Sequence, residues 1–363
     1  MGINILGLGS YVPEQKLTNN DFTRFVDTND EWIRTRTGII ERRMAGWEPT
    51  WYMGTQAALK AVEQAGISPE DIGLVISCTA TSDFHTPSMA SVIQHKTGAV
   101  NAAAFDINAA CSGFVYALDI AERFLRTDDS LKYVLVAANE ALSRFLDFED
   151  RSSCILFGDG AAAAVVGRSD KLYASHLASD GSGAGYLCAR ALQAAPEVKQ
   201  ESDFVDEFPD MPMHKLYQNG KEVYKFATQA LPKSFELAAA KCGITKDEID
   251  WFIPHQANIR IIETAAKKLG APMEKFIVTL DHYGNTSSVS IPLALNEAAA
   301  DGRIVRGQKL ALIGFGAGLT YGGAVLGMAL EFDIDKVPTF LLGMWAMISQ
   351  AVLGYKFVKK GNK

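Results

Sequence analysis

Three segments of the sequence carry side chains that together could transfer an acyl group. FDINAACSGF contains Cys111, WFIPHQAN contains His255 and DHYGNTSS contains Asn285. A thiol is a nucleophile, an imidazole moves protons and a carboxamide donates hydrogen bonds. Cys111 stands where an apolar strand gives way to an amphipathic helix, whose first N–H groups stabilise a thiolate. We therefore expect a lowered pKa for Cys111 and a thiol that is nucleophilic at neutral pH.

Each of these residues also has a structural interpretation. A free cysteine is more often a small buried hydrophobe, a lone histidine at a strand end is more often hydrogen-bonded structure, and a Gly-Asn pair is typical of a turn. The glycine-rich run FGAGLTYGG at 315–323 is either close packing or a loop whose N–H groups face an oxyanion. Small neighbours favour a reactive thiol, because they let a substrate approach: Ala109, Ala110, Ser112 and Gly113.

Composition limits the classes of function that remain. The 363 residues are 48% apolar, which is enough for a substantial core, and the formal net charge of −7 gives no field for binding nucleic acid. Five cysteines show no C-x-x-C pair and no His/Cys spacing typical of metal sites. The start MGINILGLGSYVP lacks the features of a signal peptide. We expect a reduced, cytoplasmic protein without a bound metal.

An internal repeat organises the chain. Residues 61–78, AVEQAGISPEDIGLVISC, match residues 238–255, AAAKCGITKDEIDWFIPH, at an offset of 177. FDINAACSGFVYAL matches TLDHYGNTSSVSIPLAL at an offset of 175, and YVLVAA matches KLALIG at an offset of 176. Three matches in the same order predict a duplicated architecture with halves of about 160 to 170 residues.

Each half alternates short apolar runs with amphipathic segments, which is typical of an α/β fold with strands buried on both faces. IGLVISC, KYVLVAA, WFIPH and KLALIGFG are the predicted strands, and residues 112–126 form a predicted helix. Ligands of open α/β sheets bind beyond the carboxyl ends of the strands. We expect the duplication to bring Cys111 and His255 to one central crevice.

At many separated places the sequence resembles the β-ketoacyl-acyl-carrier-protein synthase III family of the thiolase superfamily. The likeness covers residues 1 to about 332 and rests on DEWIRTRTGI, AACSGF, FGDGAAAAV, PHQANIRI, YGNTSS and FGAGLTYG. The resemblance implies a thiolase-like duplicated αβαβα five-layer fold, with halves at 1–172 and 173–332, and a homodimer. It also implies condensation of an acyl-CoA primer with malonyl-acyl carrier protein, with release of carbon dioxide and without a cofactor.

The resemblance also implies roles for individual residues. Cys111 would attack the primer thioester, and its own N–H and that of Ala317 would hold the oxyanion. His255 and Asn285 would stabilise the enolate formed on decarboxylation, beside an apolar Phe315. Further implied contacts are Trp32, Arg36, Thr37 and Arg151 for CoA, then Lys225, Arg260, Lys267 and Lys268 for the carrier protein. The implied acyl pocket has Thr86, Leu142 and Phe157.

Two other functions fit the same residues. One is a related thiolase-superfamily acyltransferase that uses another acceptor, and the other is a non-catalytic subunit that binds acyl-CoA or carrier protein. The long polar connection at 187–220 borders the expected acyl pocket, so the length of the primer stays open.

The end of the chain departs from the family pattern. Residues 333–363 form an apolar and basic extension with 19 uncharged residues between Lys336 and Lys356. Four lysines follow this stretch, and a single span would export them against the positive-inside tendency. We expect residues 337–358 to contact a membrane peripherally or to pack on the protein.

Overall fold

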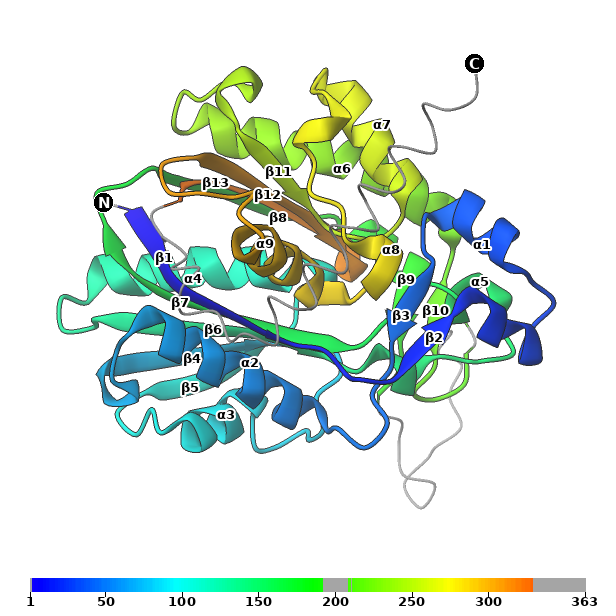
Figure 1. Ribbon diagram of the computed structural model, residues 1–363, viewed down its shortest axis with the longest axis horizontal. Coiled ribbons are helices and arrows are strands. Elements are labelled where there is room, and N and C mark those ends of the chain that lie inside the picture. The colour runs from blue at the N-terminus through cyan, green and yellow to red at the C-terminus, as the bar shows by residue number, and fades with distance from the viewer. Residues whose placement is uncertain (1, 192–207, 210, 329–363) are drawn as a thin grey trace, which may run out of the picture.

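The computed structural model describes residues 2–191, 208–209 and 211–328, which form two large sheets, two small ones and the helices around them (Figure 1). The sheet of the first half has five strands in the order β1-β7-β6-β4-β5. β4 pairs in parallel with β5 and β6, whereas β7 is antiparallel to both β6 and β1. The strands are β1 (Gly2–Tyr11), β7 (Gly160–Ser169), β6 (Tyr133–Glu140), β4 (Ile72–Cys78) and β5 (Ala103–Ile107).

The sheet of the second half has four strands in the order β11-β12-β13-β8. β11 and β12 are parallel, and the remaining pairs are antiparallel. These strands are β11 (Trp251–Pro254), β12 (Lys309–Gly316), β13 (Thr320–Gly327) and β8 (Tyr173–Ser179). Two small antiparallel sheets pair β2 (Lys16–Thr18) with β3 (Glu41–Arg43) and β9 (Leu187–Ala189) with β10 (Leu216–Gln218).

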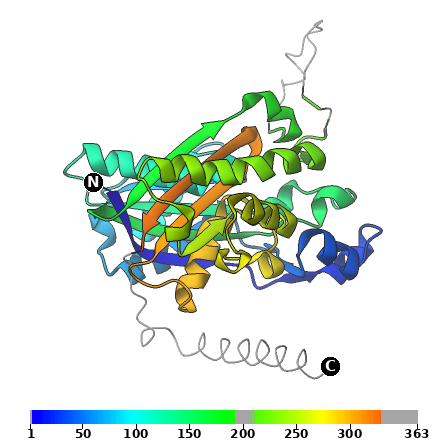
Figure 2. The same ribbon diagram turned by 90° about the horizontal axis from the view of Figure 1, so that it is seen from above.

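The helices form three layers around the two sheets (Figure 1). α4 (Gly113–Thr127) and α9 (Ser290–Ala300) lie between the sheets, and α2 (Thr50–Ala65) and α3 (Met89–Thr97) cover the outer face of the first sheet. Figure 2 shows α6 (Gly220–Ala240) lying across the second sheet, beside α7 (Ile259–Leu269). The predicted five-layer αβαβα order is therefore confirmed. Shorter helices are α1 (Asp30–Thr37), α5 (Arg151–Cys154) and α8 (Leu280–Tyr283).

The apolar pattern of the sequence explains these layers. The four predicted strands are β4, β6, β11 and β12, whose side chains are almost all buried, because helices cover both faces of each sheet. The predicted helix is α4, which turns Phe114, Ala117, Leu118, Ala121 and Leu125 into the central core.

The duplication extends to the backbone of the two central turns. α4 is preceded by a 3-10 turn at Ala110–Ser112, and α9 by one at Ser287–Val289. Ala110 has a φ of 45° and Ser287 a φ of 53°, although neither residue is glycine. These two positions are 177 residues apart, which is the offset of the first sequence match. Cys111 and Ser288 therefore occupy equivalent places, one in each half.

The expected extension at 333–363 and its proposed membrane contact at 337–358 lie outside the described residues. Among the helices that the structure does describe, none combines the length and the apolar character needed to cross a bilayer.

Candidate active site

Cys111 lies in the turn between β5 and α4, as predicted. β5 ends at Ile107, and the 3-10 turn at Ala110–Ser112 leads directly into α4. Ala110 adopts a positive φ within this turn, and only 7% of the surface of Cys111 is exposed. The thiol therefore sits at the carboxyl edge of the first sheet, at the place where ligands of α/β sheets bind.

The expected lowering of the Cys111 pKa is wrong. Burial raises the pKa of the thiol to about 12, and the negative charge of Glu140 raises it further. The Ser287 hydroxyl and a backbone N–H act in the opposite direction, but they are outweighed. The physical reason is desolvation, which the position at a helix start does not reveal. Cys111 is a neutral thiol in the resting site.

His255 follows β11 and reaches the same region from the second half. Its backbone N–H donates to the carbonyl of Ile313 at 2.8 Å, which extends the pairing of β11 with β12. The side chain is 1% exposed, and burial lowers the pKa of the imidazole to about 3. The ring centroid is 5.1 Å from that of Phe315, and Nδ1 has no hydrogen-bond partner among the described residues. His255 is therefore a neutral imidazole whose Nδ1 is available to form a hydrogen bond with a ligand.

Asn285 is held by both its backbone and its side chain. Its N–H donates to Leu156 at 2.8 Å, and its carbonyl accepts from the N–H of Gly158 at 2.9 Å. Its Oδ1 accepts from the N–H of Ser287 at 2.9 Å. Because Oδ1 is occupied in this way, the orientation of the carboxamide is set and Nδ2 is the end that can donate to a ligand.

One pocket brings Cys111, His255 and Asn285 together. The pocket has a volume of about 90 Å³, and Phe315 and Gly316 also line it. The duplicated halves thus supply one nucleophile, one neutral imidazole and one carboxamide to a single small space, as the sequence predicted. The remaining lining residues come from both halves: Leu156, Phe157, Leu187, Gln218, Gly220, Val223, Tyr224, Ala257, Asn258 and Ile261.

The loop after β12 lies directly against the nucleophile. A Cβ placed on Gly316 would be 2.6 Å from the backbone nitrogen of Cys111, so only glycine allows the two backbones to approach this closely. The Thr320 hydroxyl lies 3.0 Å from the carbonyls of both Ala109 and Ala317. Ala317 is therefore next to the Cys111 turn, and the expected role of its N–H in holding the oxyanion stays a prediction.

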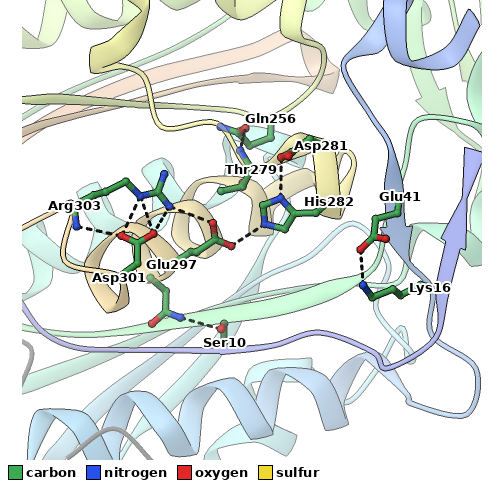
Figure 3. Close-up of polar contacts among 11 residues, drawn as sticks. Ser10, Lys16, Glu41, Gln256, Thr279, Asp281, His282, Glu297, Asp301 and Arg303 are labelled. Atoms are coloured by element: carbon green, nitrogen blue, oxygen red, sulfur yellow. Dashed lines mark hydrogen bonds and ion pairs between the residues drawn. The ribbon is translucent and has the colours of Figure 1, made fainter. Parts of the chain in front are cut away.

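Two polar side chains hold the segments that carry His255 and Asn285 (Figure 3). Gln256 donates to the carbonyls of Pro254 and Ile277, and its Oε1 accepts from the N–H of Thr279 at 2.9 Å. This buried carboxamide ties the end of β11 to the start of α8.

His282 ties the end of α8 to α9 (Figure 3). Its ring nitrogens lie 2.8 Å from Asp281 and 2.9 Å from Glu297. Hydrogen bonds and charge attraction from these two carboxylates raise the pKa of His282 to about 9, although burial opposes them. Glu297 also pairs with Arg303 at 3.2 Å. At neutral pH, a charged His282 therefore holds the segment before Asn285 against the central helix.

Comparison with known proteins decides the family. Residues 105–181 match the family profile described as 3-Oxoacyl-[acyl-carrier-protein (ACP)] synthase III, and residues 239–328 match the corresponding C-terminal profile. The chain is 46% identical over 326 residues to the Beta-ketoacyl-[acyl-carrier-protein] synthase III of Clostridium acetobutylicum, covering 89% of this chain and 98% of that protein. The chain belongs to the 3-oxoacyl-[acyl-carrier-protein] synthase III family.

Solved structures agree with this membership in the synthase III family. The 3-oxoacyl-[acyl-carrier-protein] synthase III of Aquifex aeolicus VF5 is 42% identical with a TM-score of 0.81, covering 90% of this chain and all of that one. The 3-oxoacyl-(acyl carrier protein) synthase III, FabH, from Pseudomonas aeruginosa PAO1 is 32% identical with a TM-score of 0.83, covering 92% of this chain and 100% of that one.

Most of the residues expected to contact CoA lie together in this synthase III family member. The guanidinium carbon of Arg151 is 4.9 Å from the centroid of the Trp32 ring, and that of Arg36 is 5.7 Å away. Thr37 is different, because it is 3% exposed and its hydroxyl bonds to Ile33 and Ile39 within its own segment. The placement of Thr37 gives no support to its expected contact with CoA.

The expected carrier-protein residues form an exposed basic surface on α6 and α7. Lys225 is on α6, and Arg260, Lys267 and Lys268 are on α7. These helices pack together, and the hydroxyls of Tyr224 and Thr264 meet across them at 3.2 Å. Tyr224 and Ile261 also line the pocket, so the basic surface borders the approach to Cys111.

The three expected acyl-pocket residues have different places. Phe157 lines the pocket, and Leu142 is buried in the apolar cluster that contains Phe157. Thr86 is exposed and does not line the pocket of the single chain, so its expected place in the acyl pocket stays a prediction.

Several residues beside the thiol were not singled out from the sequence. Glu140 ends the apolar run of β6, and a carboxylate in such a position is a recognisable signal for a functional group. Ser287 belongs to the YGNTSS motif, but nothing in that motif shows that its hydroxyl faces Cys111. Gly316 belongs to the glycine-rich run, which left close packing and an oxyanion loop as alternatives.

Proposed function

We propose that the protein is a β-ketoacyl-acyl-carrier-protein synthase III that starts fatty acid synthesis. The observation that carries the proposal is the single pocket lined by Cys111, His255, Asn285 and Phe315 in a member of this family. The substrates are an acyl-CoA and malonyl-acyl carrier protein, and the reaction is a decarboxylative Claisen condensation that needs no cofactor.

The first half of the reaction transfers the acyl group to Cys111. Sulfur attacks the thioester carbonyl, the carbon–sulfur bond to CoA breaks, and CoA leaves as a thiol. Because Cys111 is protonated at rest, its proton must pass to the leaving CoA sulfur. We assign the transfer to the neutral imidazole of His255, because it lines the same pocket. The N–H groups of Cys111 and Ala317 stabilise the tetrahedral oxyanion.

The second half joins two carbon atoms. Malonyl-acyl carrier protein loses carbon dioxide, and its electron pair forms an enolate whose oxygen accepts hydrogen bonds from His255 and from Nδ2 of Asn285. The apolar face of Phe315, 5.1 Å from the His255 ring, disfavours the malonyl carboxylate and so favours its departure. The enolate carbon attacks the acyl-cysteine, and the Cys111 sulfur leaves and takes a proton from solvent.

The partners follow from the surface around this pocket. We assign the adenine of CoA to Trp32 and its phosphates to Arg36 and Arg151, because the two guanidinium groups flank the indole. The acidic carrier protein docks on the basic surface of Lys225, Arg260, Lys267 and Lys268. These substrates place the reaction in the cytoplasm.

A homodimer through β5 completes the proposal. Within the described residues β5 pairs only with β4, so its outer edge is open. Large apolar side chains near this edge are exposed, with 45% of Phe84, 65% of Val100 and 43% of Phe124 accessible. A second copy pairing along β5 would cover these side chains.

The test is mass spectrometry of the intact protein after incubation with acyl-CoA esters of increasing chain length. We expect an acyl adduct on Cys111, followed by a β-ketoacyl product when malonyl-acyl carrier protein is added. Cys111→Ser should fold normally but form no adduct. An adduct on another residue, or condensation by the Cys111→Ser variant, would refute the proposal. An adduct that is passed only to other acceptors would indicate a different acyltransferase.

A further inference from the structure

Glu140 is a buried carboxyl group next to the nucleophile, and the proposed reaction gives it no task. It ends β6, it is 0% exposed, and its charge acts on Cys111. Burying a carboxylate is costly unless hydrogen bonds hold it. A buried carboxyl group retained beside a reacting thiol therefore calls for a functional explanation.

Hydroxyl and backbone donors surround the carboxyl group of Glu140. The Ser288 hydroxyl donates to Oε1 at 2.7 Å, and the Thr81 hydroxyl donates to Oε2 at 2.7 Å. The N–H of Ala80 donates to Oε2 at 3.1 Å. Thr81 also accepts a bond from the N–H of Ala141, so its own proton points to Glu140. Burial raises the pKa of Glu140, and these donors act in the opposite direction, because they favour the ionised carboxylate.

These donors connect Glu140 to the segment that carries Cys111 and to the segment that carries Asn285. Ser288 is the counterpart of Cys111 in the duplicated fold, and its Cβ would lie 3.3 Å from a Cβ on Gly113, just after Cys111. Ser287 uses its N–H to hold Asn285, while its hydroxyl interacts with both Cys111 and Glu140. A bond from Glu140 to this turn thus crosses from the first half of the protein to the second.

Few other titratable groups face the thiol. Among the described residues, those on the packed elements are His255 after β11, Cys78 at the end of β4 and Asp106 of β5. Asp106 is bound by the N–H groups of Met89 and Ala90, and its charge acts on Cys78. The pKa of Cys78 lies well above its ordinary value, and that of His255 is lowered by burial. Of these groups, Glu140 is the one whose carboxyl group acts on Cys111.

We propose that Glu140 is a positioning residue for the condensation: it anchors the turn of Ser287 and Ser288 beside Cys111 and so sets the surroundings in which the thiol reacts. Its charge opposes a free thiolate in the resting site, and the Ser287 hydroxyl favours one. The thiol thus stays protonated until a thioester and His255 are in place. This inference rests on the proposed function.

The experiment follows alkylation of Cys111 by iodoacetamide between pH 6 and 10, read by peptide mass spectrometry so that the other cysteines do not interfere. Glu140→Gln keeps the shape of the side chain and removes its charge. We expect alkylation at pH 8 to be about tenfold faster, equivalent to one pKa unit. Ser287→Ala should act in the opposite direction and slow alkylation about fivefold, as one lost hydrogen bond would.

Asp119→Asn is the matched control. Asp119 is also a buried carboxyl group, 4% exposed, on the helix that follows Cys111, but it bonds to Ser175 and Arg123. Loss of the Asp119 charge should leave the pH profile of Cys111 alkylation unchanged.

Equal profiles for the wild type and Glu140→Gln, or shifts of both Glu140→Gln and Ser287→Ala in the same direction, would overturn the inference. Because alkylation needs no acyl-CoA, these results are independent of the proposed function, which instead fails if the wild type forms no acyl-cysteine. If Glu140→Gln does not fold, Ser287→Ala alone decides, and an unchanged or faster rate overturns the inference.

Discussion

Gly316→Ala tests whether catalysis depends on the position of the backbone of the glycine-rich loop and not only on the side chains around the pocket. Gly316 has a φ of −167° and a ψ of −173°, which alanine adopts without backbone strain. The new Cβ would nevertheless be 2.6 Å from the backbone nitrogen of Cys111, whereas ordinary contact begins at 3.4 Å. The loop must therefore move by about 0.8 Å relative to Cys111. The same Cβ would lie 3.2 Å from the Cβ atoms of Ala110 and Cys111.

This displacement has a calculable effect on catalysis. The N–H groups of Cys111 and Ala317 must converge on the oxyanion at about 2.7 to 3.1 Å. Losing one such donor costs about 100-fold to 1,000-fold in rate, and a misplacement near 1 Å costs about 100-fold. We expect Gly316→Ala to form acyl-Cys111 at least about 100-fold more slowly. The stability loss from overpacking should be about 1 to 3 kcal/mol.

The assay is rapid-quench mass spectrometry of the acyl-enzyme, with thermal unfolding as the check on folding. Gly314→Ala is the matched control, because it lies on the same strand and its Cβ would be 3.3 Å from the flexible end of Ile291. The same Cβ would meet the backbone of Ser112 and Cys111 only at ordinary contact distances, 3.5 and 3.8 Å. Gly314→Ala should acylate at close to the wild-type rate. If a folded Gly316→Ala acylates within about threefold of the wild type, the assigned oxyanion site is wrong.

Two other predictions concern the segments from the second half. His255→Ala and Asn285→Ala should each slow decarboxylation of malonyl thioester by about 100-fold or more, the cost of one lost oxyanion donor, and slow self-acylation less. Stopped assays of the two half-reactions test this division, and equal losses in both would contradict it. For His282, the pKa raised to about 9 means that its stabilisation is complete below pH 6.5 and lost as the pH rises through 9. A third of the side chain is exposed, so the loss should be only about 1 to 2 kcal/mol. Urea unfolding of the wild type and His282→Gln between pH 6 and 10 measures it, and parallel pH profiles would argue against the proposed ion pairs.

Local sequence patterns predicted the strands and helices of the scaffold, and the family resemblance implied its five layers. Continuous apolar runs became buried strands, and the amphipathic 112–126 segment became α4, because helix and strand burial leave distinct periods in a sequence. The repeat predicted two equivalent halves, and the structure extends this equivalence to the positive φ angles of Ala110 and Ser287. Cys111, His255 and Asn285 could be selected because each stands in a turn at a strand end or helix start.

Some placements could not be read from local patterns. Thr37 and Thr86 were assigned by motif alone, and no local pattern shows that Thr37 is buried and Thr86 exposed. The contact between Gly316 and Cys111 joins residues about 200 positions apart. The surroundings of Glu140 also depend on contacts between distant segments, because its hydroxyl partners come from both halves of the protein.

The sequence by itself determined which chemical groups are available, which segments become strands and helices, and that the chain is duplicated. Only the tertiary structure decided which of these chemical groups carry a charge. Cys111 was expected to be a thiolate at a helix start, yet burial and the nearby Glu140 keep it a thiol, and burial keeps His255 neutral. The free energy of a charge depends on the solvent and charges around it, and packing between remote segments sets both.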